Sequence, residues 1–154
     1  MAYGRKGKGV TLHSLVEGHA LPLAAITTAA NVSEAQQVEP LLDDVKLLQG
    51  RWGKPRKNPD ALQADAAYDT RQTRTRLRSR HIRPLIVVNP RGRKHPKRGR
   101  RPAKPVDRWK GEQTFAWYQR KFRRLVVRWE RNPVYWQGFV LLAICFMWLE
   151  KLVG

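Results

Sequence analysis

The amino-acid sequence predicts an α/β fold, and the prediction rests on patterns in different parts of the chain. Two apolar segments with β-branched residues flank the turn sequence EGH at residues 17–19, which is typical of a β-hairpin. Residues 61–88 contain a strand-like run, a helix-like run and a second strand-like run, which is the order of a βαβ unit. Other apolar residues recur at helical spacing. The combination favours a sheet flanked by helices.

The composition indicates a folded domain with a polyanionic partner. The chain has 154 residues, of which 42% are hydrophobic, and this is enough to form a core. Lys and Arg number 31 against 12 Asp and Glu, which gives a formal net charge of +19. Such a charge favours nucleic acid as the partner, with an anionic membrane surface as the next alternative.

Cysteine usage and the apolar C-terminal run exclude several classes. The single Cys145 lies in the run GFVLLAICFMWL, where we expect it to be a small buried hydrophobe, and a lone cysteine excludes disulfides and Cys-based zinc sites. The run is shorter than the roughly 20 residues of a membrane span. The N-terminal MAYGRKGKG lacks the apolar core of a signal peptide. We therefore expect no membrane partner and a cytoplasmic location.

In the first half, the pattern predicts a hairpin over residues 10–29 and then a helix. Asn31 or Ser33 would cap this helix, and its apolar spacing continues up to Gly50. Pro40 would bend or delay it. Glycines and prolines predict a basic loop over residues 50–59.

The second half begins with the predicted βαβ unit. A strand is predicted over residues 61–68, a helix over residues 70–79 and a strand over residues 82–88, with the two strands parallel. Residues 89–106 are so rich in Pro, Gly, Arg and Lys that they predict a flexible basic insertion.

The C-terminal third is predicted to be helical. Residues 107–124 are compatible with an amphipathic helix, and residues 134–149 are nearly all apolar, so that the second helix should be buried against the sheet. Trp117 and Trp148 are interpreted as core residues. His13 lacks partner ligands at metal spacing and is interpreted as a structural histidine.

Asp65, Asp69 and Glu112 are the acids that could carry chemistry. Asp65 closes an apolar strand, where open α/β sheets place functional groups, and a turn residue or a metal ligand are equally open there. Asp69 is favoured as a helix N-cap. Glu112 lies among Arg and Lys, so by itself it is favoured as an ion-pair partner.

A resemblance to a known family is carried by the segments GRKGKGVTLHSLVEGHALPLA, ADAAYDT and EQTFAWYQRKFRRLVVRWER. In this order they resemble the catalytic region of bacterial insertion-sequence transposases of the DDE type, and the match runs through nearly the whole chain. The resemblance implies DNA transposition and a ribonuclease-H-like α/β fold, with a mixed sheet flanked by helices.

The same resemblance implies roles for the acids. In that family, two aspartates and a glutamate bind two divalent metals, and Asp65 matches the second aspartate and Glu112 the glutamate. Both would be catalytic ligands of Mg²⁺ or Mn²⁺, which take carboxylate oxygens. Asp69 would be an accessory residue. Arg108 matches the arginine that accompanies the glutamate, while Pro105 stands where the family has a tyrosine.

The family's first aspartate lies on the first strand of the sheet, ahead of the segment that KGKGVTLHSLVEG resembles. No aspartate precedes Asp43 in this sequence, and Glu17 falls in the hairpin turn. We therefore expect residues 1–154 to be the C-terminal part of the catalytic domain, without its first strand and inactive alone. The expected partners are DNA and an upstream transposase segment or a second copy of the transposase.

The DNA-binding prediction covers the basic insertion and the helix of Glu112, and it would associate the protein with the nucleoid. A non-enzymatic nucleic-acid-binding protein is the alternative that explains the charge equally well. The predicted DNA-binding residues are Arg91, Arg93, Lys94, Lys97, Arg98, Arg100, Arg101, Arg108, Arg120 and Lys121.

Overall fold

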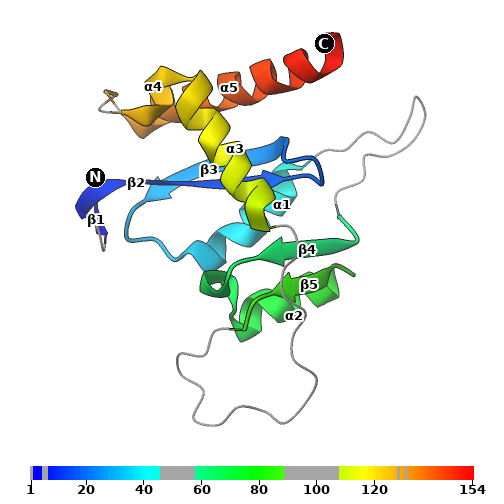
Figure 1. Cartoon of the computed structure of the whole chain (residues 1–154). Helices are drawn as coiled ribbons and strands as arrows, with labels where there is room; N and C mark the ends of the chain where they lie inside the picture. The colour runs from blue at the N-terminus through cyan, green and yellow to red at the C-terminus, as the bar shows by residue number, and fades with distance from the viewer. Residues whose placement is uncertain (1, 5–6, 46–57, 89–107, 128, 131) are drawn as a thin grey trace.

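The computed structural model of the chain describes residues 2–4, 7–45, 58–88, 108–127, 129–130 and 132–154 (Figure 1). The predicted basic insertion at residues 89–106 lies outside the described residues, as does most of the predicted loop at residues 50–59.

The predicted hairpin is confirmed. Strand β1 (Ala2–Gly4) pairs with β2 (Gly7–Val16), and β2 pairs with β3 (Pro22–Ala29), both in antiparallel orientation. The β2–β3 register runs from Val10 opposite Ala29 to Val16 opposite Pro22, with a register shift between Leu15 and Val16. These strands form one sheet in the order β1-β2-β3.

The hairpin turn is held by the side chain of Glu17. Its Oε1 accepts hydrogen bonds from the backbone N–H groups of His19 at 2.6 Å and Leu21 at 3.2 Å. Burial would raise the pKa of the Glu17 carboxyl, but the hydrogen bonds from His19 and Leu21 outweigh it and hold the pKa below 4.5. Ala20 takes a positive φ of 67° within the turn. Glu17 therefore has a structural task, in line with its interpretation as a turn residue.

The helix after the hairpin is shorter than predicted and starts late. The 3₁₀ helix η1 (Glu34–Gln37) leads into α1 (Val38–Asp44), and Ser33 occupies the N-cap position of η1 without a side-chain cap hydrogen bond. Pro40 falls in the first turn of α1, where its missing N–H has no helical partner to lose. Val45 is extended and ends the helix.

The βαβ prediction is confirmed with shorter strands. β4 (Ala61–Ala64) pairs in parallel with β5 (Arg83–Ile86), and α2 (Arg71–Ser79) connects them. The first strand was predicted to reach residue 68, which is wrong. Asp65 caps the 3₁₀ helix η2 (Ala66–Tyr68) by accepting from the Ala66 N–H at 2.6 Å, and this turn ends the strand.

The predicted helix over residues 107–124 is two helices. α3 (Arg108–Lys121) ends before Phe122, whose φ of −119° and ψ of 85° are not helical, and α4 (Arg123–Val126) follows. α5 (Pro133–Val153) is longer than predicted. Asn132 caps α5 through a 3.0 Å hydrogen bond from the Val134 N–H, and Pro133 opens it.

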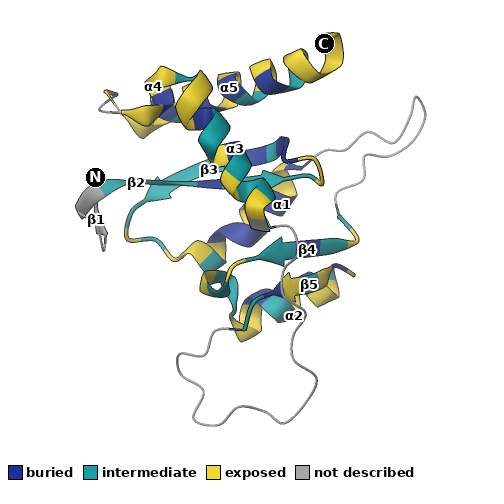
Figure 2. Ribbon diagram, viewed as in Figure 1, coloured by how far each residue is buried: buried dark blue, intermediate teal, exposed yellow. Residues whose placement is uncertain are grey.

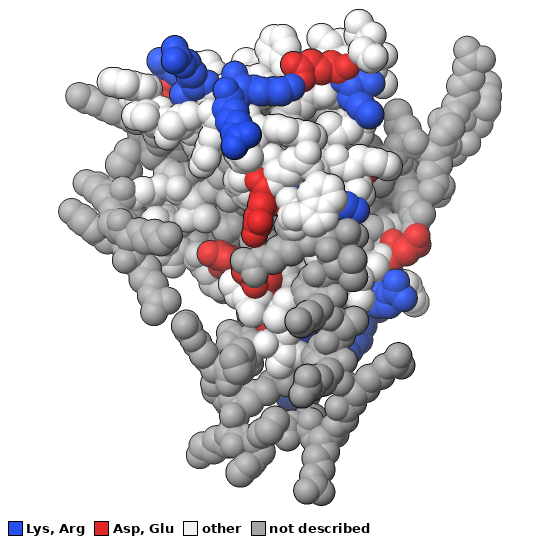
Figure 3. Space-filling view, in the orientation of Figure 1, with Lys and Arg blue, Asp and Glu red and all other residues white. Residues whose placement is uncertain are grey.

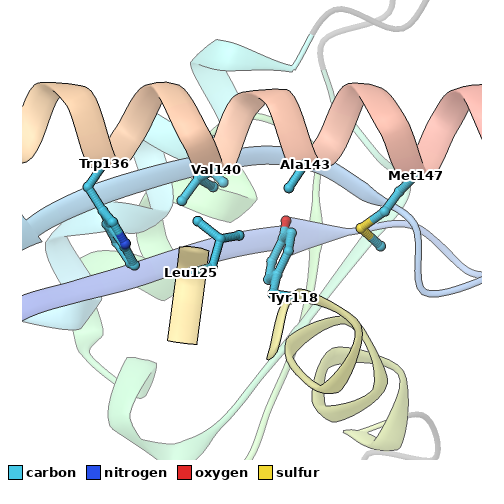
Figure 4. Close-up of a cluster of buried hydrophobic side chains, with 7 residues drawn as sticks. Tyr118, Leu125, Trp136, Val140, Ala143 and Met147 are labelled. Carbon is cyan, nitrogen blue, oxygen red and sulfur yellow. The ribbon is translucent and has the colours of Figure 1, made fainter. Parts of the chain in front are cut away.

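The elements form layers, with helices on both faces of the strands. On one face of the hairpin, Ala25 packs with buried side chains of α3, α4 and α5, and Figure 4 shows Trp136, Val140, Ala143 and Met147 of α5 directed at this cluster. On the other face, Ala24 packs with α1. The described strands form two sheets, β1-β2-β3 and β4-β5, flanked by helices. This agrees with the predicted α/β class.

α1 joins the two sheets from one side. Val38 and Leu42 of α1 share a cluster with Leu62 of β4, Leu77 of α2 and Ile86 of β5. Leu15 of β2 packs against this cluster and also against the cluster of α1 with β3. α1 and α2 therefore lie on one side of the strands, and α3, α4 and α5 on the other.

The prediction that the C-terminal helix is buried is wrong for its outer face. Leu142, Phe146 and Leu149 are each 54% exposed, and Cys145, expected to be buried, is exposed (Figure 2). Trp148 is half-buried and donates from its Nε1 to the Pro22 carbonyl at 2.7 Å.

α5 also corrects the expectation about its length. Its 21 residues are long and apolar enough to cross a membrane by length and composition, and only 22% of its apolar stretch is buried. Mostly buried core helices of soluble proteins can have the same length and composition. The sheet-facing residues of α5 are packed, and the outer residues are not, because no further layer of the described chain covers them.

Candidate functional site

Asp65 stands at the carboxyl end of β4, as predicted. Leu62 and Ala64 of this strand pack on the side of α1 and α2. Asp65 is still extended, with φ of −72° and ψ of 168°, so the alternation of side chains directs it to the opposite side. Its side chain is exposed. Asp65 therefore faces the side of the strands on which α3 lies.

Glu112 lies in the N-terminal part of α3, and its position is set by the buried face of the same helix. Thr114 and Tyr118 point to the hairpin, with exposed fractions of 0% and 2%. The Thr114 hydroxyl donates to the Ala20 carbonyl in the hairpin turn. Glu112 itself is exposed. The hairpin turn thus anchors the helix that carries Glu112.

The two predicted ligands, Asp65 and Glu112, come from different elements but belong to the same side of the molecule. Figure 3 shows acidic side chains in the middle of the face in view, and Lys and Arg side chains above them, over α4 and the C-terminal end of α3. Within the described ranges, no group of three or more His, Cys, Asp or Glu is arranged to hold a metal ion. The described residues therefore bring no third His, Cys, Asp or Glu into a metal-binding group with Asp65 and Glu112.

Asp69 is not the helix N-cap that we predicted. Thr70 takes that position, and its Oγ1 accepts from the Thr73 N–H at 3.0 Å. The Asp69 side chain is 4% exposed and pairs with Arg74 at 2.7 Å. Arg74 also donates to the Ile86 carbonyl at 2.9 Å, which ties the start of α2 to the end of β5. This geometry makes Asp69 a structural residue.

Glu34, which we did not single out from the sequence, lies near the candidate site. Burial raises the pKa of Tyr68 to about 12, and the negative charges of Glu34 and Asp65 add to this effect. Glu34 therefore shares the surroundings of Tyr68 with Asp65. The only signal for Glu34 in the sequence is its place at the start of a predicted helix. Acids are preferred at helix starts in general, so this place does not indicate a functional site.

His13 is a buried structural histidine, as predicted. It is 3% exposed, and its Nε2 lies 2.8 Å from the Thr28 hydroxyl. Burial lowers its pKa below 6.5, although the charge of Glu34 acts in the opposite direction.

The predicted DNA-binding residues fall into two groups. Arg108 is the first residue of α3, Arg120 is exposed, and Lys121 is paired with Glu150 of α5. Seven residues of the basic insertion lie outside the described residues: Arg91, Arg93, Lys94, Lys97, Arg98, Arg100 and Arg101.

Comparison with known proteins gives two matches. The family model described as the transposase DDE domain matches residues 2–148. The chain is also similar to a candidate transposase for insertion sequence element IS402 of Burkholderia cepacia, with 34% identity over 143 residues. This alignment covers 93% of the chain and 64% of that relative. No solved structure matches.

Proposed function

Because the chain belongs to the transposase DDE domain family, we propose that it acts in DNA transposition, as the part of a transposase that contributes Asp65 and Glu112 to DNA strand cleavage and joining. The chain spans 64% of the length of the curated relative it matches, so the activity of the whole protein is part of this proposal.

The observation that carries the proposal is that Asp65 and Glu112 lie on the same side of the strands. Asp65 follows a strand that is fixed by its pairing with β5, and Glu112 lies on a helix that is anchored on the hairpin turn. Exposed carboxylates on such elements suit hard divalent cations, and we propose Mg²⁺ or Mn²⁺. A bound pair of these ions would stabilise the attacking and leaving oxygens of a phosphodiester displacement.

The remaining ligand is proposed to come from another segment. Among the described strands, β4 pairs only with β5 and therefore has one unpaired edge. After Gly9, β2 pairs only with β3, so its other edge is also unpaired there. Unpaired strand edges accept further strands readily. We propose that an upstream transposase segment, or a second copy of the transposase, adds a strand with an aspartate here. The chain alone would then not cut DNA.

The basic residues support DNA as the partner. Arg108, Arg120 and Lys121 lie on the helix of Glu112, and the whole chain carries a formal charge of +19. Each phosphate that such a residue neutralises releases counterions and favours binding. We propose that these residues and the basic residues of 89–106 hold the DNA backbone, and that the protein works in the cytoplasm on nucleoid DNA.

The test is Mn²⁺-dependent cleavage of DNA that carries the ends of the element. The chain is assayed alone and fused in frame to the adjoining upstream sequence. Asp65→Asn and Glu112→Gln in the fusion remove one charge each and keep the side-chain shape. Asp44→Asn is the matched control, because Asp44 is an exposed carboxylate at the end of α1.

We expect the fusion alone to cut, the two site variants to be inactive and Asp44→Asn to keep full activity. Cleavage by the chain alone that depends on Asp65 would contradict the proposed completion by another segment. A folded but inert fusion would contradict the catalytic proposal and leave a non-enzymatic DNA-binding protein as the better account.

A further inference from the structure

An unusual run of arginines covers α2 and the start of β5. No Asp or Glu occurs between Asp69 and Asp107, so the charge of this run is balanced only by acids from elsewhere. The arginines of the run are Arg71, Arg74, Arg76, Arg78, Arg80 and Arg83.

Half of these arginines are used in ion pairs within the fold. Arg74 pairs with Asp69 at 2.7 Å, and Arg80 pairs with Asp43 at 2.5 Å. Arg76 pairs with Glu39 of α1. These pairs fasten α2 to α1 and to the loop before it, so the stability of the fold accounts for them.

Arg71 and Arg78 are different. Both are exposed, and neither side chain has an ion-pair or hydrogen-bond partner in the part of the chain that the structure describes. Seven residues separate them, which is close to two helical turns, so they lie on one line along α2 with exposed Thr75 between them. This outer face of α2 carries two charges without an internal ion pair. Arg78 lies in the last turn of α2, where the helix dipole favours a cation, whereas Arg71 does not.

Helix stability does not explain Arg71. It is the first residue of α2, where the helix dipole is positive and a cation is unfavourable. Acids are the preferred residues there, and the first turn of α2 has none. A residue that breaks a local preference without a compensating contact points to an external partner.

We propose that the outer face of α2, formed by Arg71, Thr75 and Arg78, binds the phosphate backbone of duplex DNA. The two arginines are about 10 Å apart along the helix axis, which is about the axial rise of three phosphates on one strand. α2 lies on the side of the strands opposite α3. The DNA on α2 is therefore a different stretch from the one at Asp65 and Glu112.

This inference rests on the proposed function only for the choice of DNA as the polyanion. It is tested by the fluorescence anisotropy of a short labelled duplex of arbitrary sequence, titrated at several salt concentrations in EDTA. The variants are Arg71→Gln and Arg78→Gln, singly and together, and the Arg71→Lys/Arg78→Lys pair, which keeps both charges. Lys151→Gln removes an exposed cation at the far end of α5 and is the control.

Each lost phosphate contact should lower the slope of log K against log salt by about 0.9 and the affinity by about fivefold near 0.15 M salt. We expect the double Gln variant to lower the slope by about 1.8 and the affinity by about 25-fold. The double Lys variant and Lys151→Gln should stay near wild type. Circular dichroism melts of all variants exclude unfolding as the cause.

An unchanged salt slope in the double Gln variant would overturn the proposal. So would a loss of binding to anionic vesicles with DNA binding intact, because the surface would then fit a membrane. The anisotropy assay contains EDTA and no free divalent metal. An inert fusion in the cleavage assay would therefore not change the interpretation of DNA binding by α2. Conversely, if the fusion cleaves DNA but the double Gln variant binds DNA as wild type does, the α2 proposal is wrong and the proposed function stands.

Discussion

Thr114 of α3 donates its hydroxyl hydrogen bond to the backbone carbonyl of Ala20 in the turn of the β2–β3 hairpin. Thr114 is fully buried, and Ala20 is held at a φ of 67°. The bond therefore connects a strained turn to the helix that carries Glu112 two residues earlier. The position of Glu112 depends on a contact between residues that are 94 positions apart in the chain.

Thr114→Val should destabilise the protein. It keeps the side-chain volume but leaves the buried Ala20 carbonyl without this donor, which costs about 1–3 kcal/mol in the free energy of unfolding. Urea denaturation measures this loss. Thr27→Val in β3 is the control, because no side-chain hydrogen bond of Thr27 is found in the described structure, and its effect should stay within about 0.5 kcal/mol. Equal effects of the two variants would show that the Thr114 bond contributes nothing.

Replacing Asp69 should destabilise the fold more than replacing Asp65. Asp69→Ala leaves the partly buried Arg74 without its partner and should lower the free energy of unfolding by about 3 kcal/mol. Asp65→Ala removes an exposed 3₁₀ cap and should cost about 1 kcal/mol or less. Thermal or urea unfolding of both variants gives the comparison. The reverse order would mean that the fold depends on Asp65 and not on Asp69.

His13 should make the protein less stable in mild acid. Burial lowers the pKa of His13 in the folded chain below 6.5, so the unfolded chain binds its proton first as pH falls. The stabilisation is complete above pH 6.5 and is lost as pH falls towards the folded pKa. Urea midpoints between about pH 7.5 and about pH 5 should therefore decrease, and His13→Gln should flatten this decrease. A variant with the same pH profile as wild type would assign the effect to other groups.

The outer face of α5 should cause self-association. Leu142, Phe146 and Leu149 form an exposed apolar line, and such patches promote association. Replacing all three by Ser should shift the chain to monomer in light scattering at little cost in stability. Met147→Ala, on the buried face of α5, should cost about 2–3 kcal/mol without changing the association state. Unchanged association in the triple variant would refute the role of this face.

Local patterns in the sequence predicted several elements correctly. The two apolar segments with β-branched residues around the turn at residues 17–19 predicted the hairpin, and the order of residues 61–88 predicted the parallel pair with its connecting helix. These predictions succeeded because strand-forming residues and turn residues act on neighbours within a few positions. The position of Asp65 at the end of β4 followed from the same kind of signal.

Predictions about burial and partners were less successful. Cys145 was expected to be buried and is exposed. Only one face of an apolar helix packs on the sheet, and the other face, which carries Cys145, is buried only if a further layer covers it. Asp69 was expected to cap a helix, but Thr70 does so, and Asp69 pairs with Arg74. Both residue types cap helices well, so the local preference could not choose between them.

The sequence by itself determined the class of the fold and the basic character of the chain, and it led to the prediction that Asp65 and Glu112 are the acids of a transposase site. These features depend on composition and on short-range spacing. Only the tertiary structure decided that Glu112 is anchored through Thr114 on Ala20, that Glu34 lies near Tyr68, and that Arg71 and Arg78 remain outside the internal ion pairs. Such relations join residues that are distant in the chain, and the packing of whole elements determines them.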